Sequence, residues 1–515
     1  MALLTVRFGC LLLLLSLLGP VQSGRVLRQI QQRVLLTQRH RVKQQLHSVA
    51  ARRPLLTEGR IAQPLDHLDR QNNRTFSQRY FVNLEFWHRS GGPVFLYIGG
   101  EGTLSEYSVL AGHHVSMAAQ HSALLVSLEH RYYGQSAAST LDNDQLDTER
   151  LSQLSSQQAL YDLMLFQQYI CMLYGLTSRN TWISFGGSYA GSLSAWLRGK
   201  FPHLIYGAVA SSAPVKAQLN FTEYNKVVAK SLSNPVVGGS DQCVLAVRQA
   251  FSVLDSALRS GRLSSVATDF QSCTALSDPA DRRELLSSLA GIAMGAAQYD
   301  GQGVPLSIAQ VCAIMGNSSS ADAYTRLAQL AQAYLQQVGE PCLWSSFQQR
   351  LSELQDIRLQ PGGVGERQWS YQTCTEFGYY QSCEDPSCPF SPLLTLQAQT
   401  QLCPLVFGVS EDRLASAVQF TNSYYGSDSP ATYRVLYVNG DVDPWHVLSV
   451  LPGSSCCGGR GGGGEGSLAL LIPGASHCAD MAPPYLTDPP ALREARQEIE
   501  NHVANWLNAA ELEAI

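Results

Sequence analysis

The segment that most constrains the fold of this chain is the run Thr-Trp-Ile-Ser-Phe-Gly-Gly-Ser-Tyr-Ala-Gly at residues 181–191. Its first half is apolar and β-prone, and the apolar residues that follow it have helical spacing. Ser188 lies between these halves, in a turn made of small residues. A strand, a tight turn with an exposed serine and a helix form a nucleophile elbow. Gly186 and Ala190 flank Ser188 at two residues on either side, so the usual Gly-x-Ser-x-Gly pattern is missed by one methyl group.

Continuous apolar runs predict strands that are buried on both faces. These runs cover residues 92–98, 123–128, 181–185, 205–210, 433–438 and 468–472. Helical patterns lie between them, and the resulting alternation predicts a mainly parallel α/β sheet. From about residue 216 to 404 the spacing is helical, with few β-branched runs. We therefore expect two sheet-forming halves, 60–215 and 405–510, separated by a helical cap insertion, 216–404.

Two further residues, both much later in the chain than Ser188, complete a candidate catalytic set. Asp443 follows the strand at 433–438, and His477 follows the strand at 468–472. The chain order Ser, Asp, His is that of α/β-hydrolases, so an α/β-hydrolase fold is expected. His477 would accept the proton of Ser188, and Asp443 would hold the imidazole in place. Asp441 is the rival carboxylate, and the loop position of Asp443 before a proline favours Asp443.

Other residues are candidates for binding the reacting group or the substrate. The backbone N–H of Tyr189 and that of Gly100, in a glycine-rich loop after a predicted strand, are candidate oxyanion donors. Glu376 would either recognise a substrate amine or pair internally. Glu129, His130 and Arg131 predict a structural ion-pair network at a strand end.

The N-terminus has the pattern of a secretory signal peptide at residues 1–23: Arg7, an apolar run, then Val-Gln-Ser before Gly24. Residues 24–59 form a basic segment with a loosely helical rhythm. This segment is either a propeptide trimmed near the Arg52–Arg53 pair or a solvated helical arm or loose terminus. No other segment is long and apolar enough to predict a membrane span.

Entry into the secretory pathway would place the cysteines in an oxidising compartment, where most of the twelve that remain after Cys10 should pair. Cys383 and Cys388 have no histidines at zinc spacing, so no metal site and no cofactor are predicted. Asn73, Asn220 and Asn317 are glycosylation acceptors, which predicts three exposed loops. The net charge of −5 gives no reason to expect a nucleic-acid partner.

Four motifs in order make the chain resemble the serine peptidase family that includes lysosomal prolyl carboxypeptidase and dipeptidyl peptidase II. The resemblance extends from about residue 60 to 508 and rests on residues 129–134, 186–191, 371–376 and 439–445. It implies peptide substrates cut near a terminus, often beside proline, in endosomal or lysosomal vesicles. It also implies that Ser188, Asp443 and His477 are the triad and that Trp445 lines a proline pocket. The Cys456–Cys457 pair and the glycine-rich loop after it are not part of the family pattern.

Two other functions are also consistent with the sequence. The elbow alone would also suit a lipase or esterase, although the His-Gly-Gly-Gly oxyanion motif of that group is absent. A catalytically silent interaction protein with a hydrolase fold is the third hypothesis, and the complete Ser, Asp, His set argues against it. The oligomeric state is left open between a monomer and a homodimer.

Overall fold

The computed structural model describes residues 25–48, 55–89, 91–140, 145–359, 365–454 and 466–513. The expected signal peptide, the Arg52–Arg53 pair and the Cys456–Cys457 pair lie outside these residues. Within them, one eight-stranded sheet forms the centre of the core, with the order β1-β2-β4-β3-β5-β6-β9-β10. Its strands are β1 (Leu56–Pro64), β2 (Thr75–Asn83), β3 (Val94–Ile98), β4 (Leu124–Leu128), β5 (Trp182–Gly187), β6 (Gly207–Ser211), β9 (Val435–Gly440) and β10 (Leu468–Ile472).

The sheet is mainly parallel, as the sequence predicts. Strands β4 to β10 pair in parallel, with Val94 opposite Leu124 and Ala208 opposite Val435. An antiparallel hairpin, β1–β2, extends the sheet at β4. This hairpin was not expected from the sequence. The parallel strands β3, β4 and β6 are almost wholly buried, because helices cover both faces of the sheet.

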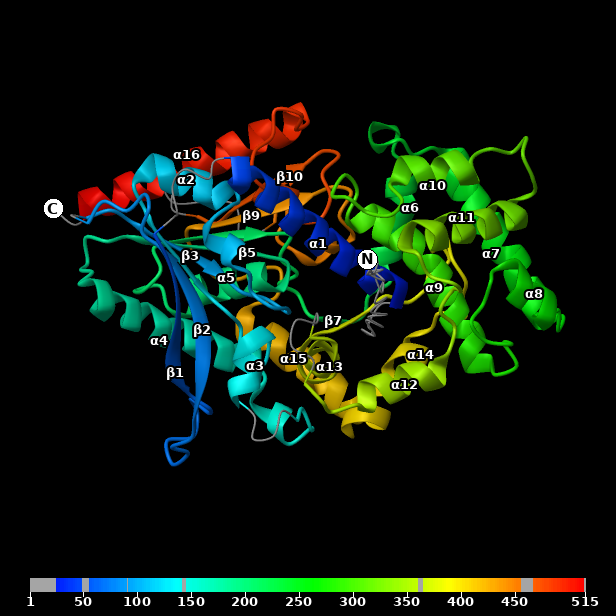
Figure 1. Ribbon diagram of the computed structural model, residues 1–515, viewed down its shortest axis with the longest axis horizontal. Coiled ribbons are helices and arrows are strands. Elements are labelled where there is room, and N and C mark those ends of the chain that lie inside the picture. The colour runs from blue at the N-terminus through cyan, green and yellow to red at the C-terminus, as the bar shows by residue number, and fades with distance from the viewer. Residues whose placement is uncertain are drawn as a thin grey trace, which may run out of the picture.

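The core helices form two layers around the sheet (Figure 1). One face carries α2 (His113–His121) and α16 (Pro490–Glu513), and the other carries α4 (Ser156–Tyr174) and α5 (Tyr189–Lys200). Local sequence sets the ends of α4: the Ser155 side chain caps the first turn, and Gly175 ends the helix in the left-handed conformation. Two further helices are α3 (Gly134–Thr140) and α15 (Glu411–Tyr425).

The chain between β6 and β9 is mainly helical, and most of it forms the cap, whose helices α6 to α11 lie on the right of Figure 1. Its helices are α6 (Glu223–Ser233), α7 (Asp241–Arg259), α8 (Leu263–Asp269), α9 (Pro279–Gln298), α10 (Ile308–Met315), α11 (Ala323–Val338), α12 (Phe347–Gln355), α13 (Glu366–Gln372) and α14 (Leu396–Thr400). A short parallel pair, β7 (Gln218–Asn220) and β8 (Gly378–Tyr380), lies within the same part of the chain. The fold is therefore an α/β-hydrolase fold with a helical cap between the nucleophile strand and the strands that precede Asp443 and His477.

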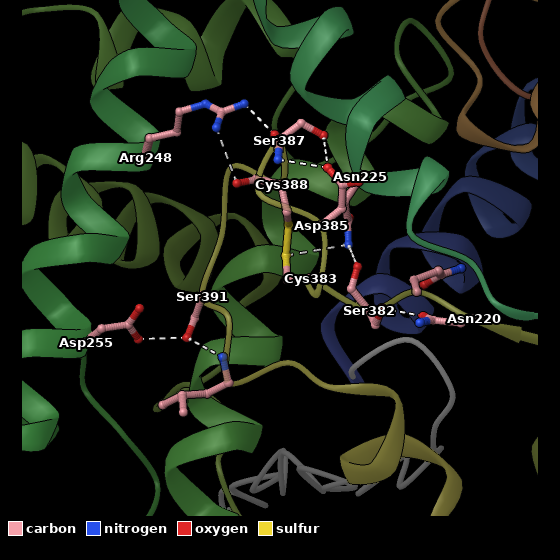
Figure 2. Close-up of a disulfide and its surroundings, with 12 residues drawn as sticks. Asn220, Asn225, Arg248, Asp255, Ser382, Cys383, Asp385, Ser387, Cys388 and Ser391 are labelled. Carbon is pink, nitrogen blue, oxygen red and sulfur yellow. Dashed lines mark hydrogen bonds between the residues drawn. A yellow bond between two sulfur atoms is a disulfide. The ribbon is translucent and has the colours of Figure 1, made fainter.

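Disulfides tie the insertion together. Eight of its cysteines pair as Cys243–Cys312, Cys273–Cys342, Cys374–Cys403 and Cys383–Cys388. Figure 2 shows the Cys383–Cys388 loop, where Arg248 of α7 donates to the Cys388 carbonyl at 3.4 Å and Ser391 donates to Asp255 at 2.7 Å. Among the described residues Cys171 and Cys478 are free. The predicted pairing of most cysteines is confirmed for these eight.

The structure corrects two sequence expectations. The basic N-terminal segment is not a solvated arm: residues 25–48 form helix α1 (Arg25–Ser48), whose apolar face is buried. Asn220 is not in an exposed loop, because it ends β7 half-buried and its Nδ2 donates to Glu384 at 2.8 Å. Asn73 and Asn317 are exposed, as expected. No helix in the described ranges is long and apolar enough to cross a membrane.

Candidate active site

Ser188 lies at the sharp turn between β5 and α5. Its backbone has φ 59° and ψ −131°, a conformation that a residue with a side chain rarely adopts. Glycines make the turn feasible, since a Cβ on Gly186 would lie 2.1 Å from the Ala190 carbonyl oxygen. The Ser188 N–H donates to the Ser211 carbonyl at 2.9 Å, which ties the turn to β6. Ser188 is half-buried, so the strained turn presents its hydroxyl at the end of the sheet.

Ala190 stands where the usual elbow pattern has a second glycine, and its methyl group faces Gly100. A Cβ built on Gly100 would lie 3.4 Å from the Ala190 Cβ and 3.6 Å from the Ala190 backbone nitrogen. The loop after β3 therefore lies directly against the start of α5. This places Gly100 beside the turn that carries Ser188 and Tyr189, where an oxyanion hole would need its donors.

The structure brings Asp443 and His477 together and keeps Asp441 apart. The Asp443 Oδ2 lies 2.8 Å from the His477 Nδ1, and both side chains are buried. The second oxygen of Asp443 accepts the Trp445 N–H at 3.0 Å, which fixes the carboxylate. Asp441 instead accepts the Gly474 N–H at 2.7 Å and so shapes the loop that precedes His477.

The surroundings of His477 favour its protonated form. Activity in an acidic vesicle would need a lowered pKa of this imidazole. Burial does act to lower the pKa of His477, but the Asp443 carboxylate and the neighbouring Cys478 thiol outweigh it, and the pKa lies well above its ordinary value. His477 therefore becomes a neutral base only toward higher pH.

The cap holds the His477 loop through its backbone. The His477 N–H donates to the Gln298 carbonyl at 2.9 Å, and the Gln302 side-chain amide donates to the His477 carbonyl at 2.6 Å and to the Ser476 hydroxyl at 2.9 Å. The Tyr299 ring packs edge-on against the imidazole, with centroids 5.9 Å apart. No sequence pattern pointed to these residues, because Gln298 at the end of α9 and Gln302 in the loop after it belong to no recognisable motif.

The core holds the same loop from its other side. The Cys478 N–H donates to the Ser212 hydroxyl at 2.8 Å. Asp480 accepts a hydrogen bond from the Ser211 hydroxyl, and burial raises the pKa of Asp480 to about 6. Arg496 of α16 donates to the carbonyls of Ala479 and Asp480 at 2.9 and 3.0 Å. The Ser188 turn and the His477 loop thus share the end of β6 as an anchor.

Trp445 forms part of an aromatic wall next to His477. Its ring lies 5.5 Å from Phe221, 5.3 Å from Tyr379 and 6.5 Å from His477, measured between centroids. Its indole N–H is buried with no hydrogen-bond partner among the described residues. Such a wall suits a flat apolar ring, and the free N–H offers one donor.

Glu376 is engaged inside the protein. One carboxylate oxygen accepts from the Ser156 N–H and hydroxyl at 2.8 and 2.6 Å, and the other accepts from Gln372 at 3.0 Å. Burial raises the pKa of Glu376 to about 7. Gln372 also donates to the Tyr189 hydroxyl at 3.0 Å. These contacts match the internal-pairing alternative rather than recognition of a substrate amine.

The strand-end network after β4 is the structural one that the sequence predicts. Glu129 pairs with Arg79 at 2.6 Å, and Arg131 binds Asp162 at 2.7 Å. His130 contacts the Tyr189 hydroxyl at 3.0 Å. No group of three or more His, Cys, Asp or Glu side chains in the described part of the chain could hold a metal ion.

Known proteins resemble this chain over most of its length. Residues 63–499 match the family model described as "Serine carboxypeptidase S28". The human thymus-specific serine protease is 43% identical over 509 residues, which cover 97% of this chain and 96% of the relative. The mouse thymus-specific serine protease is 45% identical over 459 residues, with 87% of each chain covered. The mouse lysosomal Pro-X carboxypeptidase is 27% identical and covers 86% of this chain and 88% of its own.

Proposed function

Because this chain belongs to the serine carboxypeptidase S28 family and is thus a serine peptidase, we propose that Ser188, His477 and Asp443 are its catalytic triad and that it is an exopeptidase. The observation that carries the proposal is the buried 2.8 Å contact between Asp443 Oδ2 and His477 Nδ1. This pair is anchored on the same strand end as the strained Ser188 turn. A serine, a base and a carboxylate that orients the base are the parts that acyl transfer needs.

The reaction follows from these roles. The Ser188 Oγ attacks the scissile carbonyl carbon while the His477 Nε2 accepts its proton, and Asp443 stabilises the imidazolium. Backbone N–H groups of Tyr189 and Gly100 stabilise the oxyanion. The intermediate then releases the amine product, which takes the proton from His477, and leaves an acyl group on Ser188. A water molecule then gives a proton to His477 and attacks this ester; the bond to the Ser188 Oγ breaks, the acyl group leaves as the carboxylic acid product, and the proton on His477 returns to the Ser188 Oγ.

The cap supports cleavage near a chain end. Its residues Gln298 and Gln302 bond to the His477 backbone, so the cap stands directly beside the reacting groups. A covered crevice would admit the terminus of a peptide more readily than a folded protein. The aromatic wall around Trp445 favours a proline ring next to the cleaved bond.

We place the enzyme in the secretory pathway, in endosomal or lysosomal vesicles or released from the cell. The four disulfides support an oxidising compartment, and exposed Asn73 and Asn317 are suitable glycan acceptors. The raised pKa of His477 favours the less acidic of these compartments.

A fluorophosphonate probe followed by peptide digestion tests the function. We expect labelling of Ser188 in the wild-type chain and none in Ser188→Ala, with the same thermal unfolding for both proteins. Digests of peptide libraries should show cuts near termini and enrichment of proline beside the cut. Hydrolysis of short-chain esters without hydrolysis of peptides would favour a lipase or esterase instead. Labelling that persists in Ser188→Ala would refute the triad assignment.

A further inference from the structure

Helix α1 is basic, and its first turns and its apolar residues are buried. It carries six Lys or Arg residues and no acidic residue. Its apolar face is inside the protein, with Ile30 only 2% exposed, whereas Leu36 on the same helix is 55% exposed. Figure 1 shows α1 running between the sheet and the cap helices. A helix placed there contacts both the cap and the core, next to the candidate active site.

On the side of the cap, α1 packs closely against helix α9. Gly291 and Gly295 of α9 face α1, and a Cβ on Gly295 would lie 2.4 Å from the Ile30 Cδ1. The absence of a side chain at both glycines lets the two helices approach closely. At its first residue, Arg25 pairs with Glu353 at 3.1 Å and lies over the Trp344 ring at 3.5 Å.

On the side of the core, α1 contacts the loop after β3, which carries the candidate oxyanion donor Gly100. Arg39 of α1 donates to the Thr103 carbonyl at 2.9 Å, three residues after Gly100. Arg28 on the same helix is buried, and burial lowers its pKa, while the carboxyl groups of Glu366 and Glu101 oppose this shift. α1 therefore contacts the core at the loop after β3 as well as the cap at α9.

Glu366, at the start of α13, is a buried carboxyl group that interacts electrostatically with Arg28 of α1. Its side chain is 4% exposed, and neither carboxylate oxygen has a hydrogen-bond partner among the described residues. Burial raises the pKa of Glu366 to about 8, and the charges of Arg28 and Arg350 act in the opposite direction. A buried carboxyl group without a hydrogen bond is costly unless a positive charge lies nearby.

A single glutamine joins α1 to the candidate base. The Gln38 side chain of α1 donates to the Gln302 side-chain oxygen at 3.0 Å. The amide nitrogen of the same Gln302 donates to the His477 carbonyl at 2.6 Å. Gln302 therefore links α1 to the loop that carries His477.

We propose that the groove between α9 and the loop after β3 is a binding site for a basic amphipathic helix, that α1 is its intramolecular occupant, and that α1 obstructs the path of peptides to Ser188. The full chain is then a partly inhibited form with low peptide hydrolysis, which increases when α1 leaves. This inference rests on the proposed peptidase function. Its physical basis is that α1 contacts both the cap helix α9 and the loop after β3, which lies against the Ser188 turn, while Ser188 itself is only half-buried.

Cleavage of the folded full chain tests the obstruction. A recognition sequence for a specific endopeptidase is inserted between residues 48 and 55. The folded chain is cut at this sequence, and the released α1 segment is separated from the rest of the protein. We expect peptide hydrolysis to rise at least ten-fold, while fluorophosphonate labelling of Ser188 occurs in both forms. A synthetic peptide of residues 25–48 should restore inhibition when it is added back. The same peptide with Ile30→Asp and Val34→Asp should not.

Point variants in the uncut chain provide the matched control. Ile30→Asp places a charge against Gly295 and should raise peptide hydrolysis, whereas Leu36→Asp makes the same change at an exposed site and should not. Arg39→Gln removes only the contact to Thr103 and serves if Ile30→Asp fails to fold. Equal hydrolysis before and after cleavage, with Ser188 labelled in both, would overturn the obstruction and leave the peptidase function standing. No labelling in either form would overturn the proposed function and this inference with it.

Discussion

At the scale of single residues, two carboxylates on the loop after β9 differ in what they contact. Asp443 is paired with His477, and Asp441 holds the Gly474 N–H. Asp443→Asn keeps the shape but loses the charge that orients the imidazole, so we expect kcat to fall by about 10⁴-fold. Asp441→Asn should lower kcat less than ten-fold. Steady-state kinetics on a proline-containing peptide distinguish the two, and the reverse order would show that Asp441 is the triad carboxylate.

The protonation of His477 sets a pH dependence at the same scale. The imidazole must be neutral to accept the Ser188 proton, and Asp443 with Cys478 raises its pKa well above the ordinary value. As pH falls through this raised pKa, His477 becomes protonated and the base is lost. We expect kcat/KM to increase from acidic toward neutral pH and to reach its plateau above pH ~6.5, the ordinary histidine pKa. A profile with its maximum near lysosomal pH would contradict this direction.

At the scale of secondary-structure elements, α16 determines where the His477 loop lies. Arg496 is 4% exposed and donates to two carbonyls of that loop. Arg496→Gln leaves these buried acceptors unpaired, which costs about 1–3 kcal/mol of stability. We expect a lower melting temperature and a lower kcat, with KM nearly unchanged. Arg493→Gln, an exposed site one turn earlier on the same helix, is the control and should change neither quantity.

At the scale of the whole molecule, the disulfides lie in the insertion, while the insertion holds the candidate base. Cys243–Cys312 spans 69 residues, and loss of a disulfide that closes so long a loop costs roughly 4 kcal/mol. Because α9 and the residues after it bond to the His477 backbone, loosening the cap should also displace the imidazole. We expect Cys243→Ser to lower both the melting temperature and the activity. Cys171→Ser, which changes a free cysteine of the core, should leave both unchanged.

Chain order and local pattern were enough to predict the strands, the cap insertion and the pairing of most cysteines. Each of these follows from interactions between near neighbours: apolar runs form buried strands, and glycines around Ser188 permit one kind of turn. For the same reason the spacing in residues 25–53 indicated a helix. The β1–β2 hairpin was missed, because its strands alternate too weakly to stand out.

The α/β-hydrolase fold and the order of Ser188, Asp443 and His477 follow from the amino-acid sequence alone. The three-dimensional arrangement was needed to show that Asp443 rather than Asp441 contacts His477, that Glu376 is engaged internally, and that Gln302 and Arg496 hold the His477 loop. It alone decided that α1 is buried against Gly291 and Gly295 of a helix far along the chain. The physical reason is that these contacts join residues distant in sequence. Their energy comes from shape and charge across a packed interface, which no periodicity in either segment records.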